Sequence, residues 1–414
     1  MLRLSRTTTG IFALARGLLV PGNIRALAVT SMVTGTYISL LNTVLQPFVV
    51  GALGFNVAIL GILVSVGARP SGLASSIGQP FGGYFADLIG RKPLIVLGSA
   101  IGICSMVSFL VSAVTRSLPP LSIAYLLFGL SLLGYPASQA TIAESVAVDP
   151  GKVKVAFSVV FFFTQLPGAV VPFVAGYLAT SVGYPVLFGA AALLESGNLV
   201  ILISKVSETR QPPAAGATKN EVSFSLRQAF RVPPGLLRIF VPFGMDAFSF
   251  GLGGSIVYGM WIKQFGLTAG DVGLVVGVLS SSVVVSQYAA TRFLLRVGIR
   301  KTLAFSEFIT VVVLAAWLGA PNLPLLLVVS AVFGFSVATW VPAVSSLLIA
   351  VAPVEERGGV NGKLAAFRGL MAFPAPIIGG FLFNAFGYYV PISLSLVGEV
   401  LTTVALLKLI PSGK

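Results

Sequence analysis

The stretch from Phe81 to Leu94 reads FGGYFADLIGRKPL and places Asp87, Arg91 and Lys92 within six residues. Only 9% of the chain is charged, and long apolar runs lie on both sides of this stretch. A phosphate-binding loop, the end of a membrane helix, or part of a moving gate could each place charges there. The phosphate loop is excluded, because Pro93 follows the lysine where a serine or threonine hydroxyl is needed.

The composition indicates an integral membrane protein. Of the 414 residues, 56% are hydrophobic, and the mean hydropathy is +0.99. A soluble domain is about one quarter charged, so the charged fraction here is too small to cover a globular surface. The net charge of +14 does not indicate nucleic-acid binding, because the basic residues lie between apolar segments.

The chain lacks the residues that most enzyme and metal sites need. It has no histidine, and its one cysteine, Cys104, falls inside an apolar segment. We therefore expect no metal site, no disulfide, no cofactor and no enzymatic activity. A membrane-embedded enzyme, the remote alternative, would need clustered His, Cys or paired carboxylates. Any proton carried through the protein must use carboxylates.

Apolar runs predict twelve transmembrane helices, since a span needs about 20 mostly apolar residues. The expected spans are 24–50, 57–85, 93–115, 121–145, 155–180, 184–204, 236–262, 272–295, 302–320, 323–351, 362–384 and 388–410. The expected organisation is a lead-in at 1–22, a six-helix bundle at 23–204, a polar linker at 205–235 and a second six-helix bundle at 236–414. Bends are expected at Pro70 and Pro80, at Gly251–Gly254, and at Pro374 and Pro376.

The distribution of Lys and Arg predicts the orientation. With the N-terminus inside, 21 of the 26 basic residues fall on the cytoplasmic side, and only Arg116 and Lys263 fall in external loops. Cytoplasmic loops carry the excess of Lys and Arg. Both termini and the linker are therefore expected to be cytoplasmic, in a multi-pass protein of the cytoplasmic membrane.

The two halves of the chain repeat one another. Five residues of the first half recur 204 positions later: Pro172, Gly176, Gly183, Tyr184 and Glu195 match Pro376, Gly380, Gly387, Tyr388 and Glu399. A six-helix unit repeated in the same order predicts two parallel bundles related by an axis along the membrane normal.

Two six-helix halves, a polar linker and a charged loop after the second helix resemble the major facilitator superfamily. The loop residues Gly83, Asp87, Gly90, Arg91 and Lys92 match its signature G-x-x-x-D-R-x-G-R-R/K. Leu88 departs from the signature, which has a basic residue there. The resemblance covers essentially the whole chain. It implies an all-α fold of 12 transmembrane helices and a transporter that works by alternating access.

The second-half copy of this loop, residues 291–301, is only partly similar. It keeps Gly298, Arg300 and the basic Arg296, but Leu295 replaces the acid. The resemblance implies that Asp87 docks near the start of the eleventh helix, at residues 358–362. It also implies that Arg91 pairs with Glu144, so that a cytoplasmic latch closes in the outward-open state. The alternative is simple anchoring by Arg91 and Lys92.

Several ionisable residues are expected well inside spans, among them Arg69, Asp246 and Arg368. Such residues are costly in a bilayer and usually face a bundle interior or a cavity. In one interpretation both arginines contact an anionic substrate, while Asp246 balances one of them or carries a proton. In the other, Asp246 forms a purely structural pair with an arginine across the bundle interface. Glu195 and Glu399 are expected on peripheral helices, where a cavity role is less favoured, and Glu307 near the interface.

Polar and aromatic residues predict the walls of a substrate cavity. The expected lining residues are Asn42, Gln46, Tyr135, Gln139, Tyr258 and Trp340, although each could instead serve helix packing. We expect a monomer in the lipid bilayer that moves a small organic solute. Efflux of amphipathic compounds or metabolites coupled to H+ is one hypothesis. Uptake or exchange of an organic anion through Arg69 and Arg368 is another, and a non-transporting receptor on the same fold is a third.

Overall fold

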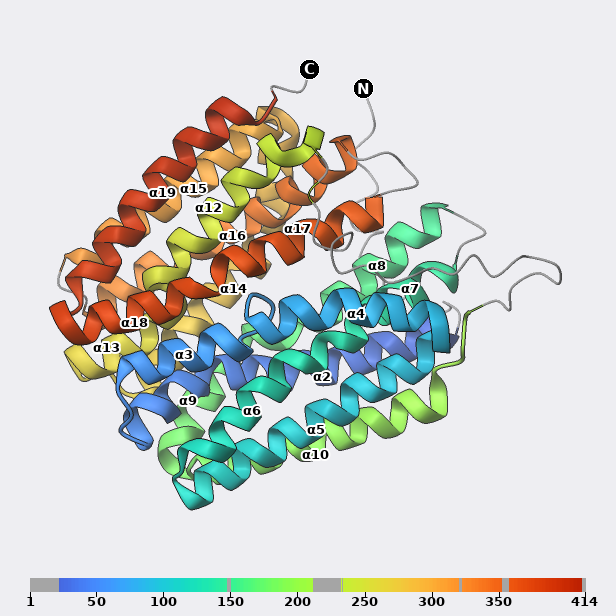
Figure 1. Cartoon of the computed structure of the whole chain (residues 1–414), viewed down its shortest axis with the longest axis horizontal. Helices are drawn as coiled ribbons and strands as arrows, with labels where there is room; N and C mark the ends of the chain where they lie inside the picture. The colour runs from blue at the N-terminus through green and yellow to red at the C-terminus, as the bar shows by residue number, and fades with distance from the viewer. Residues whose placement is uncertain are drawn as a thin grey trace.

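The computed structural model describes residues 22–146, 150–210, 232, 234–319, 322–351 and 357–411. These residues form helices joined by short turns, and they contain no strand (Figure 1). The first-half helices are α2 (Gly22–Gln46), η2 (Pro47–Ala52), α3 (Val57–Gly67), α4 (Leu73–Ile89), α5 (Arg91–Thr115), α6 (Leu118–Leu130), η3 (Ser131–Gly134), α7 (Tyr135–Glu144), α8 (Pro150–Gln165), η4 (Leu166–Ala169), α9 (Val171–Ser181) and α10 (Tyr184–Lys205).

The second half begins after the linker and has the same general order. Its helices are η5 (Pro234–Leu236), α12 (Leu237–Gly253), η6 (Gly254–Ile256), α13 (Val257–Phe265), α14 (Ala269–Val297), α15 (Ile299–Leu318), α16 (Leu323–Val351), α17 (Arg357–Ala372), α18 (Pro374–Phe386) and α19 (Tyr389–Leu409). In Figure 1 the blue-to-green helices of the first half and the yellow-to-red helices of the second half lie in two groups.

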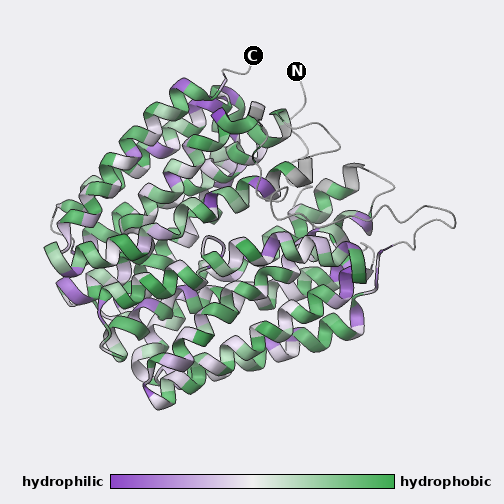
Figure 2. Cartoon of the chain, in the orientation of Figure 1, coloured by the Kyte–Doolittle hydropathy of each residue, from purple (hydrophilic) through white to green (hydrophobic). Residues whose placement is uncertain are grey.

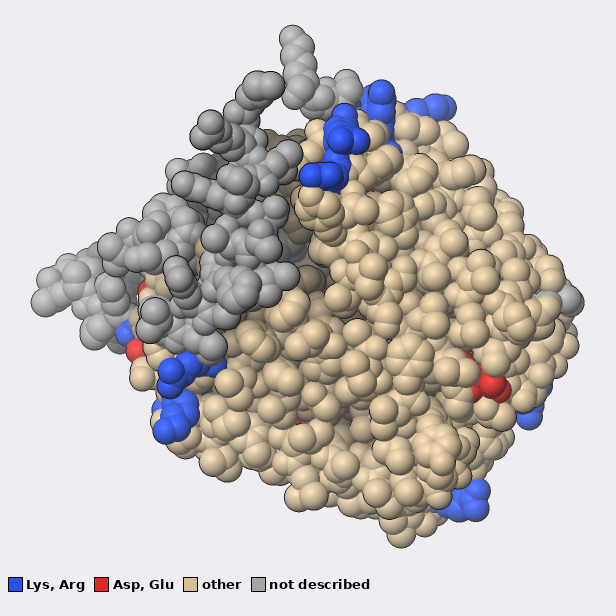
Figure 3. Space-filling view, turned by 180° about the vertical axis from the view of Figure 1, so that it is seen from behind, with Lys and Arg blue, Asp and Glu red and all other residues tan. Residues whose placement is uncertain are grey.

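Ten helices of the described chain are long and apolar enough to cross a membrane, or eleven if one bent pair counts as a span. The bent pair joins Val155–Ala169 to Val171–Ser181 at 42°. Figure 2 shows hydrophobic residues along the helices and hydrophilic ones mainly near helix ends. Figure 3 shows a broad, nearly uncharged face with charged side chains at its margins, as a surface facing lipid requires.

The second predicted span, 57–85, is not one continuous helix. It is interrupted between α3 and α4, because Pro70 has no N–H and keeps the residue before it out of the helical region. The N–H of Gly72, which precedes the first residue of α4, donates to the carbonyl of Ala68 at 2.8 Å across this break. The bends predicted near Gly254 and Pro374 coincide with helix breaks, whereas Pro80 lies inside α4.

The α4–α5 turn and its second-half counterpart have the same backbone shape. Gly90 has φ 114° and ψ 164°, and Gly298, between α14 and α15, has φ 85° and ψ 163°. A positive φ is readily adopted only by glycine. The end of the molecule that carries the α4–α5 turn is called the turn end below.

The buried apolar residues form one core that is common to both halves and two that are not. The common core contains residues such as Phe48 and Phe188 from the first half and Trp261 and Tyr388 from the second, at the end opposite the turn. At the turn end, one core consists only of first-half residues, and the other only of second-half residues. The halves are therefore packed together at the opposite end and separately packed at the turn end.

Backbone contacts at glycines bring the halves together. A Cβ on Gly61 of α3 would collide with the carbonyl of Pro376 in α18, and a Cβ on Gly176 of α9 would lie 2.8 Å from the Cα of Gly273 in α14. The side chain of Gln46 adds two hydrogen bonds across the halves, to the carbonyl of Ser255 and from the N–H of Gly259, both 2.9 Å.

Candidate functional site

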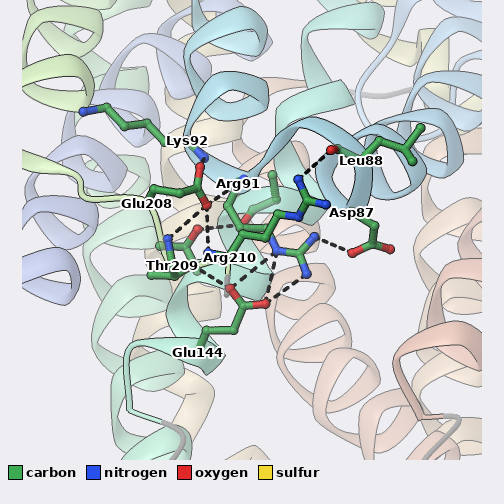
Figure 4. A network of polar contacts seen from close by, with 10 residues as sticks. Asp87, Leu88, Arg91, Lys92, Glu144, Glu208, Thr209 and Arg210 are labelled. Atoms are coloured by element: carbon green, nitrogen blue, oxygen red, sulfur yellow. Dashed lines mark hydrogen bonds and ion pairs between the residues drawn. The ribbon is translucent and has the colours of Figure 1, made fainter. Parts of the chain in front are cut away.

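A network of charges surrounds the α4–α5 turn (Figure 4). Arg91, the first residue of α5, donates from Nε and Nη2 to Glu144 at the end of α7, at 3.1 and 3.0 Å. Its Nη1 contacts Asp87, one helical turn earlier in α4, at 2.5 Å. The contact between Arg91 and Glu144 is the one that the family resemblance implied.

The start of the linker completes this network. Four backbone N–H groups donate to the Glu208 carboxylate at 2.9 to 3.0 Å, those of Arg91, Lys92, Thr209 and Arg210. Burial by itself would raise the pKa of the Glu208 carboxyl, but these hydrogen bonds favour the charged form and lower the pKa below its ordinary value. A Cβ on Gly90 would lie 2.6 Å from Glu208 Oε2, so glycine also makes room for this carboxylate.

Three more side chains tie the turn to its neighbours. Thr209 donates from Oγ1 to Glu144 at 2.6 Å, on the carboxylate that also accepts from Arg91. Arg210 donates from Nη1 to the carbonyl of Leu88 at 2.5 Å. Lys92 donates from Nζ to the carbonyl of Ile203, in the last turn of α10, at 2.7 Å.

Asp87 does not make the predicted docking contact in this conformation. Its side chain is 69% exposed, and its hydrogen bond is to Arg91 rather than to the described part of α17. The side chains of residues 357–359 and 361, at the expected docking point, lie outside the described set. A Cβ added at Gly83 would lie 3.8 Å from Pro136, which is an ordinary contact, whereas a Cβ added at Gly82 would collide with the backbone of Leu133. It is therefore Gly82, and not the predicted Gly83, that permits the close helix approach.

A polar cavity of about 240 Å³ lies within the first half. Its walls come from α2, the α3–α4 connection, α5, η3, α7, α8 and α10. The polar residues that line it are Thr30, Ser31, Thr34, Tyr37, Arg69, Ser99, Ser131, Tyr135, Ser138, Gln139, Thr164, Glu195 and Asn198. Three of the predicted cavity residues, Arg69, Tyr135 and Gln139, therefore line one space.

Arg69 reaches this cavity from the break between α3 and α4. Its Nη2 donates to Ser131 Oγ at 2.5 Å, and its guanidinium carbon lies 4.8 Å from the centroid of the Phe128 ring. Its Nε is buried without a hydrogen-bond partner among the described groups. A buried guanidinium N–H without an acceptor is costly, and Nε is too enclosed for a water or a ligand to reach it in this conformation.

Glu195 lies in the wall of the same cavity, contrary to the expectation for a peripheral helix. It accepts hydrogen bonds from Ser99 Oγ at 2.6 Å and from Asn198 Nδ2 at 3.0 Å. Asn198 Oδ1 has no partner among the described groups. The cavity thus offers one guanidinium, one carboxyl group and many hydroxyls, a set that suits a small polar solute.

A second charged cluster lies inside the second half. Arg368 of α17 donates from Nη2 to Asp246 Oδ2 of α12 at 2.7 Å. Carboxyl oxygens of Asp246, Glu307 of α15 and Glu399 of α19 lie within 4.8 Å of one another. The pair that Asp246 forms lies within one half, so the predicted pairing across the bundle interface is not what the structure has.

Glu307 and Glu399 lie deep in the bundle. Glu307 is 3% exposed and Glu399 is fully buried, so the expectation that Glu307 lies at the interface is wrong. Both oxygens of Glu399 and Oε2 of Glu307 have no donor among the described groups. Three converging carboxylates of this kind could hold protons or a cation.

The other predicted cavity residues have different surroundings. Gln46 bridges the halves through backbone groups, as described above. Tyr258 packs against Trp261 with ring centroids 5.6 Å apart, and Trp340 packs edge-on against Phe243 at 5.5 Å. These contacts match the packing alternative. Asn42 is exposed and does not line the polar cavity.

Sequence reasoning missed two groups of residues. The linker residues Glu208, Thr209 and Arg210 carried no motif that pointed to the turn. The convergence of Glu307 and Glu399 on Asp246 needs the packing of three helices. One signal was available, because the repeat pairs Glu399 with Glu195, and each lies beside a cluster of polar groups in its own half.

Comparisons with known proteins agree with this fold. A family model described as Major Facilitator Superfamily matches residues 27–261 and 239–414. No curated protein sequence matches the chain. The chain is similar in structure to a human organic anion transporter (TM-score 0.67, 16% identity, 93% of this chain and 99% of that one). It is also similar to a D-xylose-proton symporter (0.73, 15%, 94% and 98%) and a nucleoside transporter (0.69, 13%, 94% and 99%).

Proposed function

The chain belongs to the Major Facilitator Superfamily, and from that premise we propose that it is a secondary active transporter that moves a small organic solute by alternating access. The fold of its structural neighbours, which are transporters, supports this class rather than an enzyme. In this proposal it has 12 transmembrane helices in two bundles, 23–204 and 236–414, and acts as a monomer in the cytoplasmic membrane.

The turn end faces the cytoplasm in this proposal, together with both termini and the linker. Most Lys and Arg residues fall on that side, as the positive-inside rule requires. The common apolar core at the opposite end and the separate cores at the turn end support an inward-facing state. The exposure of Asp87 agrees, because a latch on α17 would be released in this state.

The polar cavity around Arg69 is the observation that carries the proposal. A donor-rich space of about 240 Å³ inside an apolar bundle is expensive to build and has no packing role. Arg69, the guanidinium that lines the cavity, would bind an anionic or strongly accepting group of the solute. Ser138, Gln139 and Tyr135 would bind its other polar groups. Uptake or exchange of an organic anion fits this set best.

Proton coupling would use the carboxylates of the second half. If Asp246, Glu307 and Glu399 were all ionised, Arg368 would balance only one of three negative charges. Burial of two uncompensated charges in a bilayer is prohibitive, so two positive charges must accompany them. Protons suit this buried cluster, because a protonated carboxyl group is neutral and can donate a hydrogen bond to a neighbouring carboxylate.

Efflux of an amphipathic compound is the second candidate, and one observation favours it. An apolar hollow of about 640 Å³ lies between α12, the α17–α18 pair and α19. Met245, Phe367 and Leu401 are among its lining residues. A hydrophobic part of a solute would fit such walls.

Transport into liposomes tests both the cavity and the coupling. The protein is reconstituted with a pH-sensitive dye inside, and a panel of organic anions, sugars, nucleosides and amphipathic amines is added outside. Arg69→Gln should abolish the solute-dependent response, while Arg116→Gln, whose arginine lies outside the cavity, should keep it. Asp246→Asn should remove the pH change. A full response from Arg69→Gln would overturn the cavity assignment, and unchanged pH dependence in Asp246→Asn would overturn the proton role.

A further inference from the structure

The α4–α5 turn caps its helix ends only through its backbone, where the N–H of Gly90 donates to the carbonyl of Ala86 at 3.2 Å. The last turn of α4 contains no basic residue, and the N-cap of α5, Gly90, has no side chain to accept a hydrogen bond. Helix ends leave carbonyl groups and N–H groups without partners inside the helix. A cation is favourable at the carboxyl end of a helix, and an anion at the amino end.

The second-half copy of the turn shows what the first half lacks. In α14 the last turn contains Arg296, two residues before Gly298. The corresponding residue of α4, two before Gly90, is Leu88. The two turns have the same backbone shape, so the first half lacks a cation at a position where the second half has one.

Residues 208–210 supply both caps from 116 to 122 positions away in sequence. Arg210 places its guanidinium on the Leu88 carbonyl, at the carboxyl end of α4. Glu208 accepts from the N–H groups of Arg91 and Lys92, at the amino end of α5. Thr209, between them, holds the carboxylate of Glu144.

We propose that Glu208, Thr209 and Arg210 form a strap that positions the Asp87–Arg91 turn, and that Arg210 is its key positioning residue. The strap fixes the turn against Glu144 and keeps Arg91 and Asp87 at a defined place on the first half. Its charges balance in number, with three carboxylates (Asp87, Glu144 and Glu208) and three cations (Arg91, Lys92 and Arg210). The ion pairs are those of Arg91 with Asp87 and Glu144 (Figure 4). This inference rests on the proposed gating function of the turn.

The strap has a mechanical consequence, because the chain continues from Arg210 into the linker toward the second half. The segment that caps the turn is also the start of the connection between the halves. It therefore couples the position of the turn to the linker. Loss of the strap would loosen the turn and weaken its docking on α17. The turn end would then close less often.

Thiol accessibility tests this without a known substrate. In a Cys104→Ser background, Ser138→Cys places one cysteine in the cavity wall. A membrane-impermeant maleimide is applied from the turn end in oriented vesicles, and the labelling rate is measured. Arg210→Gln should raise the rate roughly two- to fivefold, as expected from losing one helix-end cation. Adding Leu88→Arg should restore the original rate, because it supplies the cation on α4 itself.

Two controls separate the possible failures. Lys205→Gln removes an exposed cation at the end of α10 and should leave the labelling rate unchanged. Glu144→Gln tests the gate itself and should raise the rate. If Glu144→Gln raises the labelling rate and Arg210→Gln does not, the proposed strap is wrong and the gating function of the turn is retained. If neither acts, the gating function fails as well. A rise in Arg210→Gln that Leu88→Arg does not reverse also contradicts the capping role.

Discussion

Substitution of Gly61 by alanine should open the end of the molecule opposite the turn. Gly61 lies in α3, where the common core joins the halves, and its backbone faces Pro376 and Gly380 of α18. A Cβ at this position would lie 2.9 Å from the Pro376 carbonyl carbon and still closer to its oxygen. Both are backbone atoms, so no side-chain rotation relieves the collision, and the two helices must separate.

The expected size follows from the cost of overpacking, about 1–3 kcal/mol for an added methyl group in a tight contact. The cost applies only while α3 and α18 are in contact. It therefore shifts the equilibrium toward the state that is open at this end by about 5- to 150-fold. Alanine also favours helix by about 1 kcal/mol over glycine, but this gain is common to both states and cancels.

Distances between spin labels report the shift. Labels at Ser181→Cys and Lys263→Cys, both exposed and in different halves, measure this opening in a Cys104→Ser background. Gly61→Ala should add a population at longer distance. Gly197→Ala in α10 is the matched control, because a Cβ there meets nothing within 4 Å. A distance distribution for Gly61→Ala that coincides with that of Gly197→Ala would refute the close-contact argument.

Two further predictions concern the turn. Gly90→Ala should destabilise the protein more than Gly298→Ala. Both substitutions force a residue with a Cβ to positive φ, which costs about 1–2 kcal/mol, but only the Cβ at position 90 also collides with Glu208. Thermal unfolding would measure the difference in stability between the two variants. Glu208→Gln should lower Tm at pH 7. The pKa of Glu208 is depressed in the folded protein, so its carboxylate stabilises the fold above about pH 4.3 and loses that effect as the pH falls through the folded pKa. The Tm gap between the two proteins should therefore stay constant down to about pH 4.3 and narrow as the pH is lowered further, and a gap that stays constant below that pH would contradict this assignment.

The sequence predicted the helical membrane class because hydropathy is a property of each segment on its own. It also predicted the repeat, and the glycines of the two equivalent turns have the same backbone shape. It predicted the contact between Arg91 and Glu144 through the family resemblance. The break at 68–72 shows the limit of this reasoning, because the apolar run alone suggested one continuous helix.

The cavity could be predicted only in part. Arg69, Tyr135 and Gln139 share one space, as expected, but Gln46, Tyr258 and Trp340 contribute to packing between or within the halves. A polar or aromatic residue on a membrane helix serves equally well in a cavity or against a neighbouring helix. Its own sequence neighbourhood does not distinguish the two.

The sequence by itself determined which segments are apolar enough to be membrane helices and where the charged turn lies, because apolar length and glycine positions act locally. Only the tertiary structure decided which charges meet. Asp246, Glu307 and Glu399 come from three helices separated by 61 and 92 positions, and Glu208 and Arg210 reach a turn more than 110 positions earlier. Helical periodicity assigns a residue to a face of its own helix. The neighbour of that face depends on how all the helices pack together.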